Sequence, residues 1–518
     1  LSQSRFLPIT NSYFLLERTA DTTISNVSAS QIYTGALANE GEYLKLSDAS
    51  GNLIDAVDAS AGWFSGDNTT KQSMERVSAS QGGSSAANWA KNNTIQHNGK
   101  DAGTAMLYST PGNFINGTPT QANSTVTSPT IIEANIGLRF DEFSTITLTL
   151  LGSPYITTGI TIPALKTLII EPGVQVKFHD YVGYLIVQGT IQATGTQGSQ
   201  IIFTTVSDGG AIWCGIKVTS TSTASQLAYV VVDKAQSLSG GGCNQSSITY
   251  SMYVESSAVT INNSVIQTGS YHRKLYLKNS NSTINALTVS GATLNADSVG
   301  IYIDGGSPTI SNSTISNNSI GILVNGLSNN PTIQNNTFTG NTYPVKLESA
   351  AAALSGNTAT SNTYNGIFVE GITQVNTTWQ KDAIPYVMNK FTVGAGTTLT
   401  IQAGVVVKFM NTPYADSGIT VEGTLIAQGT SVNPVVFTAV GDNTVGGSNT
   451  FSGAFPTTSW KWIYFAAGST GSQLTHTMLN YGGNTYYKAA LYVKQSSVQV
   501  SNLTISNSAQ SAIYSSLG

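Results

Sequence analysis

The chain offers few residues that could do chemistry, and their spacing argues against a catalytic centre. Four histidines are present, at His97, His179, His272 and His476. None has a partner at the spacing of a metal site, and no His-Glu-x-x-His or Gly-x-Ser-x-Gly phrase occurs. His179-Asp180 is the one suggestive pair, but a related stretch later in the chain has Met410-Asn411 at that place, so we interpret the pair as part of a loop. We predict no catalytic, cofactor-binding or metal-binding residues.

The carboxylates are too sparse for the two-acid chemistry of sugar-cleaving enzymes. Such an enzyme needs acids grouped on one face, with calcium or a base nearby. Between residues 250 and 378 the acids are Glu255, Asp297, Asp304, Glu348 and Glu370. Asp304 and Glu370 take similar positions in a repeated phrase, but Asn325 and Ser349 are expected between them, which separates the two carboxylates by about 14 Å. That distance exceeds either hydrolytic carboxylate pair, and calcium is not indicated.

A duplication within the chain indicates the kind of fold that positions these residues. The stretch TLIIEPGVQVKF at 167–178 returns as TLTIQAGVVVKF at 398–409, with eight of twelve positions identical. Further phrases repeat downstream, including MYVESSAVTINNSVI at 252–266 and LYVKQSSVQVSNLTI at 491–505. A duplication built from short β-rich phrases indicates a repetitive architecture.

A shorter period lies inside the duplication. The phrase apolar-x-apolar is centred on Tyr253, Tyr276, Tyr302, Leu323, Lys346 and Phe368, at steps of 23, 26, 21, 23 and 22 residues. A second phrase opens in step with it, at Ile261, Ile284, Ile310, Ile333 and Leu354. Two strands locked in phase at this period predict a parallel β-helix, in which the inward residues of each coil pack on the coils above and below.

The centre of the first phrase predicts a surface feature. If its flanking residues point inward, Tyr253, Tyr276, Tyr302, Leu323 and Phe368 point outward along one line, with Lys346 interrupting. An exposed aromatic row usually marks an interaction surface, here for sugar rings or a neighbouring protomer. The alternative is that the linker or a long loop folds over the row, or that tyrosines simply suit β-surfaces.

Asparagines two residues after the aliphatic that opens the second phrase are interpreted as turn residues. They are Asn263, Asn312, Asn335 and, in the second copy, Asn502. Asparagine tolerates left-handed backbone angles and can bond to the next coil. The two cysteines, Cys214 and Cys243, fall on neighbouring coils at this period, so a disulfide between them is geometrically feasible, with two buried thiols as the alternative.

The composition limits the classes of protein to which the chain can belong. Only 9% of residues are charged, against about 25% in a typical soluble protein, while 40% are hydrophobic. No run of about 18 apolar residues exists, which excludes a membrane-spanning helix, and a net charge of −4 provides no field for nucleic acid. Asn-x-Ser/Thr triplets suit a secreted protein and predict glycosylation sites at Asn26, Asn68, Asn116, Asn312 and Asn335, although turns also favour asparagine.

Residues 1–118 differ from the rest because they lack the coil period. Alternating segments at 13–18, 42–48 and 52–58 are typical of antiparallel strands in a small sandwich. Glu17, Arg18 and Arg76 are expected to be structural ion-pair or capping partners. The order SYFLLERT, GEYLKLSDASGNLIDAVD, SMER, Trp89 and Thr110-Pro111-Gly112 resembles lamin-tail-like domains, which are immunoglobulin-like sandwiches. That family's opening strand is missing before Leu1, so the resemblance implies an incomplete domain or one completed by another chain.

The remainder resembles the right-handed parallel β-helices of secreted and cell-surface prokaryotic proteins, through the repeated LxIxxGVxVxF, VxGTxxAxGT and TIxN phrases. The expected fold is all-β: a partial sandwich (1–118), a linker (119–150), one β-helix (151–378) and a second, shorter and possibly incomplete one (379–518). This scaffold serves lyases, adhesins and surface-layer subunits alike.

The expected function is a noncatalytic extracellular structural protein: a subunit of a surface layer, filament or sheath, or a stalk-like adhesin. Its expected partners are copies of itself, with carbohydrate as a further one. The alternative is a secreted carbohydrate-binding or polysaccharide-degrading protein. Electron microscopy of purified material and a polysaccharide panel would separate the two.

Overall fold

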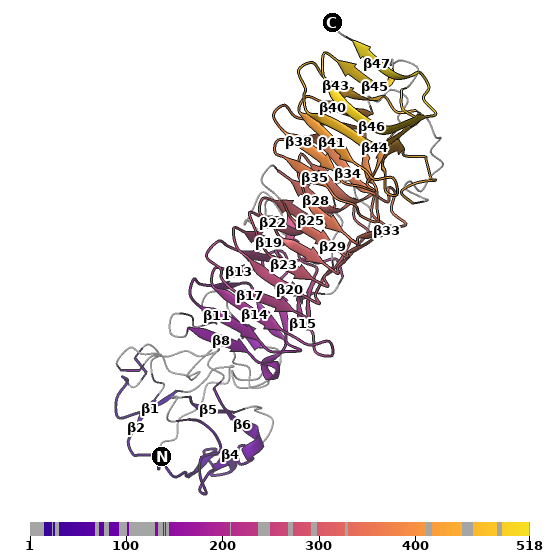
Figure 1. Cartoon of the computed structure of the whole chain (residues 1–518). Helices are drawn as coiled ribbons and strands as arrows, with labels where there is room; N and C mark the ends of the chain where they lie inside the picture. The colour runs from indigo at the N-terminus through magenta and orange to yellow at the C-terminus, as the bar shows by residue number, and fades with distance from the viewer. Residues whose placement is uncertain are drawn as a thin grey trace.

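The computed structural model is an elongated β-solenoid of about 13 turns with a smaller β-unit at its N-terminal end (Figure 1). The structure describes residues 15–22, 24–25, 29, 31–67, 72–76, 82–92, 101–102, 130–132, 138, 140, 144–207, 209–236, 249–267, 273–291, 298–326, 330–410, 417–447, 459–483 and 489–516. These residues are all-β, with two short 3₁₀ turns, η1 (Ala86–Asn88) and η2 (Leu150–Gly152). None of their helices is long and apolar enough to cross a membrane.

We call the first β-helix (151–378) the first module. Three parallel sheets form its faces, and strands just before residue 151 also belong to two of these sheets. Sheet 1 contains β10 (Ile160–Ile162), β13 (Leu185–Val187), β16 (Ile216–Val218), β19 (Tyr250–Glu255), β22 (Arg273–Lys278), β25 (Val299–Asp304), β28 (Ile320–Asn325), β31 (Tyr343–Glu348) and β34 (Ile367–Ile372). Sheet 2 contains β8 (Thr145–Leu148), β11 (Thr167–Ile170), β14 (Thr190–Thr194), β17 (Ser225–Ala228), β20 (Val259–Asn262), β23 (Thr283–Asn285), β26 (Thr309–Ser311), β29 (Thr332–Gln334) and β32 (Ala353–Ser355). Sheet 3 contains β7 (Thr130–Ile132), β9 (Tyr155–Thr157), β12 (Gln175–Phe178), β15 (Ile201–Thr205), β18 (Val230–Asp233), β21 (Val265–Gln267), β24 (Thr288–Ser290), β27 (Thr314–Ser316), β30 (Thr337–Thr339) and β33 (Thr358–Thr360).

The second module (379–518) and the strand that precedes it continue the solenoid. Their strands are β35 (Thr377–Trp379), β36 (Tyr386–Met388), β37 (Lys390–Val393), β38 (Thr398–Ile401), β39 (Val406–Phe409), β40 (Gly418–Val421), β41 (Thr424–Gln428), β42 (Val435–Ala439), β43 (Trp462–Phe465), β44 (Ser472–Asn480), β45 (Ala489–Lys494), β46 (Val498–Ser506) and β47 (Ser511–Ser516). Sheets 2 and 3 end at β32 and β33, whereas β34 pairs with both β36 and β37. Strand pairing between the two modules therefore passes through β34, while the apolar core is continuous across the boundary. Strands β7 and β8, inside the predicted linker, already pair with solenoid strands.

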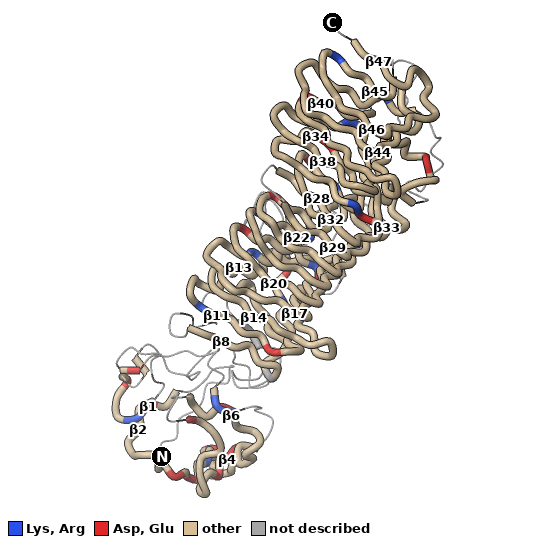
Figure 2. Tube along the Cα trace, in the orientation of Figure 1, with Lys and Arg blue, Asp and Glu red and all other residues tan. Residues whose placement is uncertain are grey.

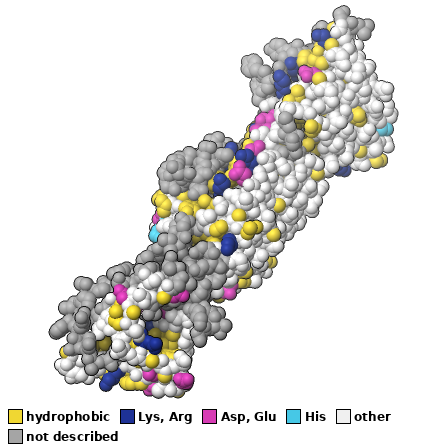
Figure 3. Space-filling model, turned by 90° about the vertical axis from the view of Figure 1, so that its left-hand side faces the viewer, with side chains coloured by type: hydrophobic (Ala, Val, Ile, Leu, Met, Phe, Trp, Pro, Cys, Tyr) yellow, Lys and Arg dark blue, Asp and Glu magenta, His cyan; other side chains and the backbone are white. Residues whose placement is uncertain are grey.

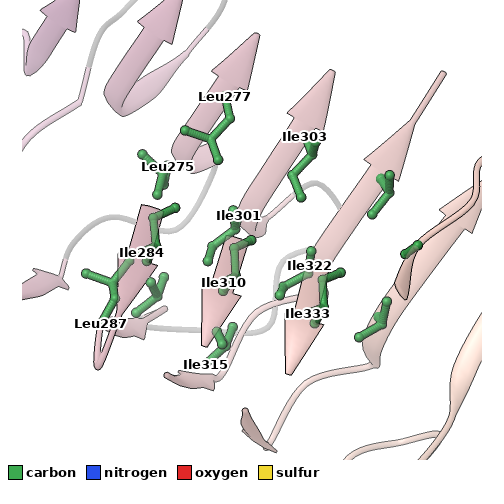
Figure 4. Close-up of a cluster of buried hydrophobic side chains, with 14 of the residues drawn as sticks. Leu275, Leu277, Ile284, Leu287, Ile301, Ile303, Ile310, Ile315, Ile322 and Ile333 are labelled. Atoms are coloured by element: carbon green, nitrogen blue, oxygen red, sulfur yellow. The ribbon is translucent and has the colours of Figure 1, made fainter. Parts of the chain in front are cut away.

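The coil period predicted from the sequence is confirmed in the strand register. Ile261, Ile284, Ile310, Ile333 and Leu354 are successive Cα partners in sheet 2. Each is at most 2% exposed, and one continuous apolar core runs from Phe140 to Leu491. Figure 4 shows how the aliphatic side chains of adjacent coils stack inside the solenoid. Burying these residues against their own repeats removes the need for a large globular core.

The turn asparagines also behave as expected. Asn263, Asn312, Asn335 and Asn502 all have positive φ, between 48° and 55°. Sequence analysis did not identify a second set of asparagines. Each of these stands one residue after a turn residue of positive φ and is buried. Asn336 and Asn357 are fully buried, and Asn336 donates its backbone N–H and its side-chain amide to the side-chain oxygen of Asn357, at 3.1 Å each. A parallel column runs through Asn318, Asn341 and Asn362.

The described N-terminal strands form three separate pairs: β1 (Leu16–Arg18) with β2 (Gln31–Tyr33), β3 (Tyr43–Ser47) with β4 (Leu53–Asp58), and β5 (Met74–Arg76) with β6 (Trp89–Lys91). The antiparallel pairing of the segments at 42–48 and 52–58 is confirmed. It is wrong for the segment at 13–18, because β1 pairs with β2 in parallel. Arg76 forms the expected structural ion pair, with Asp55. A complete immunoglobulin-like sandwich is not shown by these short strands.

Candidate functional site

The outer face of sheet 1 carries a column of side chains that we call the aromatic row: Tyr253, Tyr276, Tyr302, Leu323, Lys346 and Phe368. These residues are successive Cα partners on six neighbouring coils, so the predicted alignment is confirmed. The rings of Tyr253 and Tyr276 are 4.9 Å apart between centroids, and those of Tyr276 and Tyr302 are 4.8 Å apart. The strand spacing of a parallel sheet thus sets the ring spacing.

The prediction that this row is exposed is wrong. Tyr253, Tyr276, Tyr302, Leu323 and Phe368 are only 3–8% exposed. The three tyrosines and Leu323 form a hydrophobic cluster of their own, outside the main core, with Tyr250 and Val299 beside them. Tyr250 and Val299 pack against the row from the same strands as Tyr253 and Tyr302. Whether the row is an interaction surface stays a prediction.

Two residues beyond the aromatic row lies a charged row: Glu255, Lys278, Asp304, Asn325, Glu348 and Glu370. The sequence had placed Ser349 in this column, which is wrong, because Ser349 is a turn residue with φ 49°. Glu348 takes the position instead and is the Cα partner of Glu370. The structure therefore brings together two carboxylates that sequence reasoning did not pair. Their strands are neighbours, about 5 Å apart.

Lys346 sits between these two glutamates. Its ammonium group lies 2.5 Å from the carboxylate of Glu348 and 2.8 Å from that of Glu370, and its side chain is 16% exposed. Burial alone would lower the pKa of Lys346, but the hydrogen bonds to both carboxylates outweigh it and raise the pKa. The lysine is thus held protonated. A general base needs a pKa near the operating pH, so this lysine is unsuited to proton abstraction.

The other acids of the charged row are paired as well. Tyr276 donates its hydroxyl to Asp304 at 2.7 Å, and Lys278 donates to Glu255 at 3.2 Å. Burial, and then the hydrogen bond to Asp304, raise the pKa of Tyr276. For Glu255, burial works toward a higher pKa, but Lys278 and Tyr253 lower it overall. Each carboxylate of the charged row therefore has a cation or a phenol as its partner.

The described histidines form no metal site. Across the described ranges, no group of three or more His, Cys, Asp or Glu side chains could hold a metal ion. Asp180, next to His179, accepts from the hydroxyl groups of Ser207 and Thr205 and from the backbone N–H of Ser207, and these hydrogen bonds lower its pKa. His476 lies within β44 at a residue with φ 44°, and its Nε2 is 3.3 Å from the side-chain amide of Asn502. His97 and His272 lie outside the described residues.

Two buried lysines were missed by sequence reasoning. Lys274 and Lys408 are both 0% exposed, and burial lowers the pKa of each to about 8. Lys408 donates to the backbone oxygen of Asp442 at 2.8 Å, and Asp442 accepts from the hydroxyls of Thr438 and Thr444. Lys408 lies in the duplicated VKF phrase, at a position that alternation along the strand predicts to point outward. This pattern was the signal by which sequence analysis could have identified it. Its network fastens the loop after β42 to the solenoid.

The remaining predicted sites are placed only in part. Cys214 is buried and disulfide-bonded, and Cys243 lies outside the described residues, so the pairing stays a prediction. Asn312 and Asn335 are exposed turn residues, and Asn312 donates its side-chain amide to Asn285 at 2.7 Å. Asn26, Asn68 and Asn116 lie outside the described residues. Glycosylation at these five positions stays a prediction.

Comparison with known families agrees with this geometry. Residues 228–378 match the right-handed β-helix region, and residues 370–490 match the pectate-lyase-like β-helix domain. The two matches overlap at residues 370–378, shortly after the last strands of sheets 2 and 3. No curated protein and no solved structure matches the chain. The chain therefore contains right-handed β-helix regions.

Proposed function

We propose that the chain is a noncatalytic, extracellular structural protein, a rigid rod that forms part of a surface layer, filament, sheath or adhesive stalk. The observation that carries this proposal is the pairing of every carboxylate in the charged row, with Lys346 held protonated between two of them. Each carboxylate of this face is thus already engaged by a lysine or a tyrosine hydroxyl of the same face. The face has the character of a structural surface and not of a pair of carboxylates poised for acid and base catalysis.

The length and continuity of the core support the rod. A single apolar column extends through both modules, so bending would break contacts in many coils at once. The chain is also poor in charge, which lowers the repulsion between copies packed side by side (Figure 2). Copies of itself are the proposed partners. The lamin-tail-like sandwich proposed for residues 1–118 would serve as a docking unit at one end.

Electron microscopy of the purified full chain tests this proposal. Regular filaments or sheets would support it. Monomeric rods at every concentration, combined with release of products from a polysaccharide, would overturn it.

A second candidate function is a secreted carbohydrate-binding or polysaccharide-degrading protein. It is favoured by the match of residues 370–490 to the pectate-lyase-like domain and by the adjacent carboxylates of Glu348 and Glu370. Incubating the chain with acidic and neutral polysaccharides, with and without calcium, tests it. If degradation is seen, Glu348→Gln and Glu370→Gln should abolish it, whereas Glu255→Gln, at the far end of the same row, should not.

A further inference from the structure

We propose that the second module carries a binding site for an uncharged polysaccharide, formed by Trp462, Tyr464, Tyr492 and Tyr514, which we call the aromatic platform. This inference rests on the carbohydrate-related candidate function and does not depend on assembly into polymers. None of the four residues was singled out from the sequence. They lie on the face of the second module that continues sheet 1.

The platform is a second aromatic row, built by the same geometry as the first. Tyr464, Tyr492 and Tyr514 are successive Cα partners on β43, β45 and β47. Their ring centroids are 5.1 Å apart at each step. Trp462 joins them from the same strand as Tyr464, with centroids 5.2 Å from Tyr464 and 5.5 Å from Tyr492. Four aromatic rings thus form one contiguous group along the solenoid axis.

The platform differs from the buried aromatic row in its exposure. All four side chains are half-buried, whereas the tyrosines of the first row are almost fully covered. The rings are tilted against one another by 34° to 72°, so they present edges and hydroxyl groups as well as faces. Aromatic groups that offer an apolar body and a polar tip suit ligands with both characters. Sugar rings have an apolar face and a rim of hydroxyl groups.

The repeat of the platform fits a polymer. Rings recur at the coil spacing, which is close to the length of one pyranose residue in an extended chain. Toward the first module the same column continues with Thr420 and Thr392, which add hydroxyl groups in register with the tyrosines. A polysaccharide lying along the solenoid axis would meet one side chain of this column per coil.

The charges around the platform favour an uncharged ligand. The column from Thr392 to Tyr514 contains only hydroxyl-bearing side chains. Lys461 is 8% exposed, and its ammonium group lies 4.2 Å above the ring of Trp462. The exposed charged residues beside the column include Lys390, Glu422 and Lys494, which lie on or next to three different strands and are not in register with one another. In Figure 3 the upper part of the solenoid shows mostly neutral side chains. A polyanion would meet only isolated charges of both signs along this column, not the row of cations that would match its repeat.

Affinity electrophoresis and pull-down with the full chain test the proposal. The probes are a soluble mixed-linkage β-glucan, microcrystalline cellulose, chitin and polygalacturonate. Binding to at least one of the three uncharged probes is expected, with little effect of added salt because no ion pairs form. Tyr492→Ala should weaken that binding roughly threefold to tenfold, from the loss of one aromatic contact.

Two further variants make the result specific. Tyr181→Ala, which removes a 52% exposed tyrosine from a loop of the first module, is the matched control and should bind as the unchanged chain does. Tyr492→Phe removes only the hydroxyl group and keeps the test informative if Tyr492→Ala does not fold, as judged by circular dichroism. Tyr492→Phe should still bind, more weakly than the unchanged chain.

The proposal is overturned by either of two results: no binding to any uncharged probe, including binding to polygalacturonate alone, or equal binding by Tyr492→Ala and the unchanged chain. Electron microscopy of the same variants tests the structural proposal separately. If a variant that does not bind polysaccharide still forms filaments, the proposal of a structural rod stands even though the binding proposal has failed.

Discussion

Asn357 donates its backbone N–H and its side-chain amide to the carboxylate of Asp382, at 3.0 and 2.7 Å. One coil earlier Asn336 donates its backbone N–H and its side-chain amide to the one side-chain oxygen of Asn357, whereas the two donors of Asn357 meet the two oxygens of Asp382. Asp382 therefore ends a column of asparagines where the first module meets the second. Burial raises the pKa of Asp382, although these hydrogen bonds act to lower it. A carboxyl group thus occupies a place that a neutral amide fills on the preceding coils.

Asp382→Asn leaves one side-chain oxygen for the two donors of Asn357, as Asn357 itself offers one oxygen to the two donors of Asn336, and should therefore be tolerated. A carboxyl group whose pKa is raised on folding stabilises the protein at low pH, and this contribution is lost as pH rises through the raised pKa. The variant should match or exceed the stability of the unchanged chain at neutral pH, by up to about 1 kcal/mol, and should lose part of the gain seen on acidification. Guanidinium unfolding at neutral and mildly acidic pH measures both. A clear loss of stability at neutral pH would contradict this account.

Asn357→Ala should be strongly destabilising. The substitution removes the acceptor for Asn336 and the donor to Asp382, and it leaves buried polar groups without their partners. Each such group costs about 1–3 kcal/mol. Ser355→Ala, on an exposed position of the same coil, is the control and should stay within about 0.5 kcal/mol. Equal effects of the two substitutions in urea unfolding would show that the buried column is not a main stabilising element.

Lys346→Met should expose the repulsion between Glu348 and Glu370. With the cation removed, two neighbouring carboxylates lack a counter-charge, and we expect a loss of roughly 1 kcal/mol at neutral pH, moderated because both glutamates are partly exposed. The double variant Lys346→Met, Glu370→Gln should recover part of it, as guanidinium unfolding at neutral pH measures. No recovery in the double variant would point to packing alone.

The buried lysines predict an alkaline dependence. The pKa of Lys408 and that of Lys274 are lowered to about 8, while an unfolded lysine keeps its proton to about pH 10.4. Between these values the unfolded state binds more protons, so stability should rise with pH. Lys408→Met should reduce that rise, as measured by unfolding midpoints between about pH 7 and pH 10. The same slope in both proteins would show that Lys408 is not the group responsible.

The proposed disulfide has a direct test. If Cys214 pairs with Cys243, thiol titration of the denatured, unreduced chain should find no free thiol. Reduction should lower stability by about 3–4 kcal/mol, because the closed loop is about 30 residues long. Cys214→Ala with Cys243→Ala should reproduce the loss. Two titratable thiols would rule the bond out.

The coil period, the inward-pointing aliphatic residues and the turn asparagines with positive φ could all be predicted from the sequence alone. These follow from local rules, since inward and outward residues alternate along a strand and a stacked coil must repeat its apolar positions. Ile261, Ile284 and Ile310 were aligned correctly for this reason, and so were Tyr253, Tyr276 and Tyr302.

Which side chains cover those positions, and which polar groups come into contact, could be seen only in the folded structure. The burial of Tyr276 depends on side chains from neighbouring coils, the contact of Lys346 with Glu348 and Glu370 depends on the register of one turn around Ser349, and the column through Asn357 depends on which of two adjacent asparagines turns inward. A one-residue difference in register moves a side chain to the opposite face. Alternation along a strand fixes the pattern of faces, but only the packed coils fix the neighbours across them.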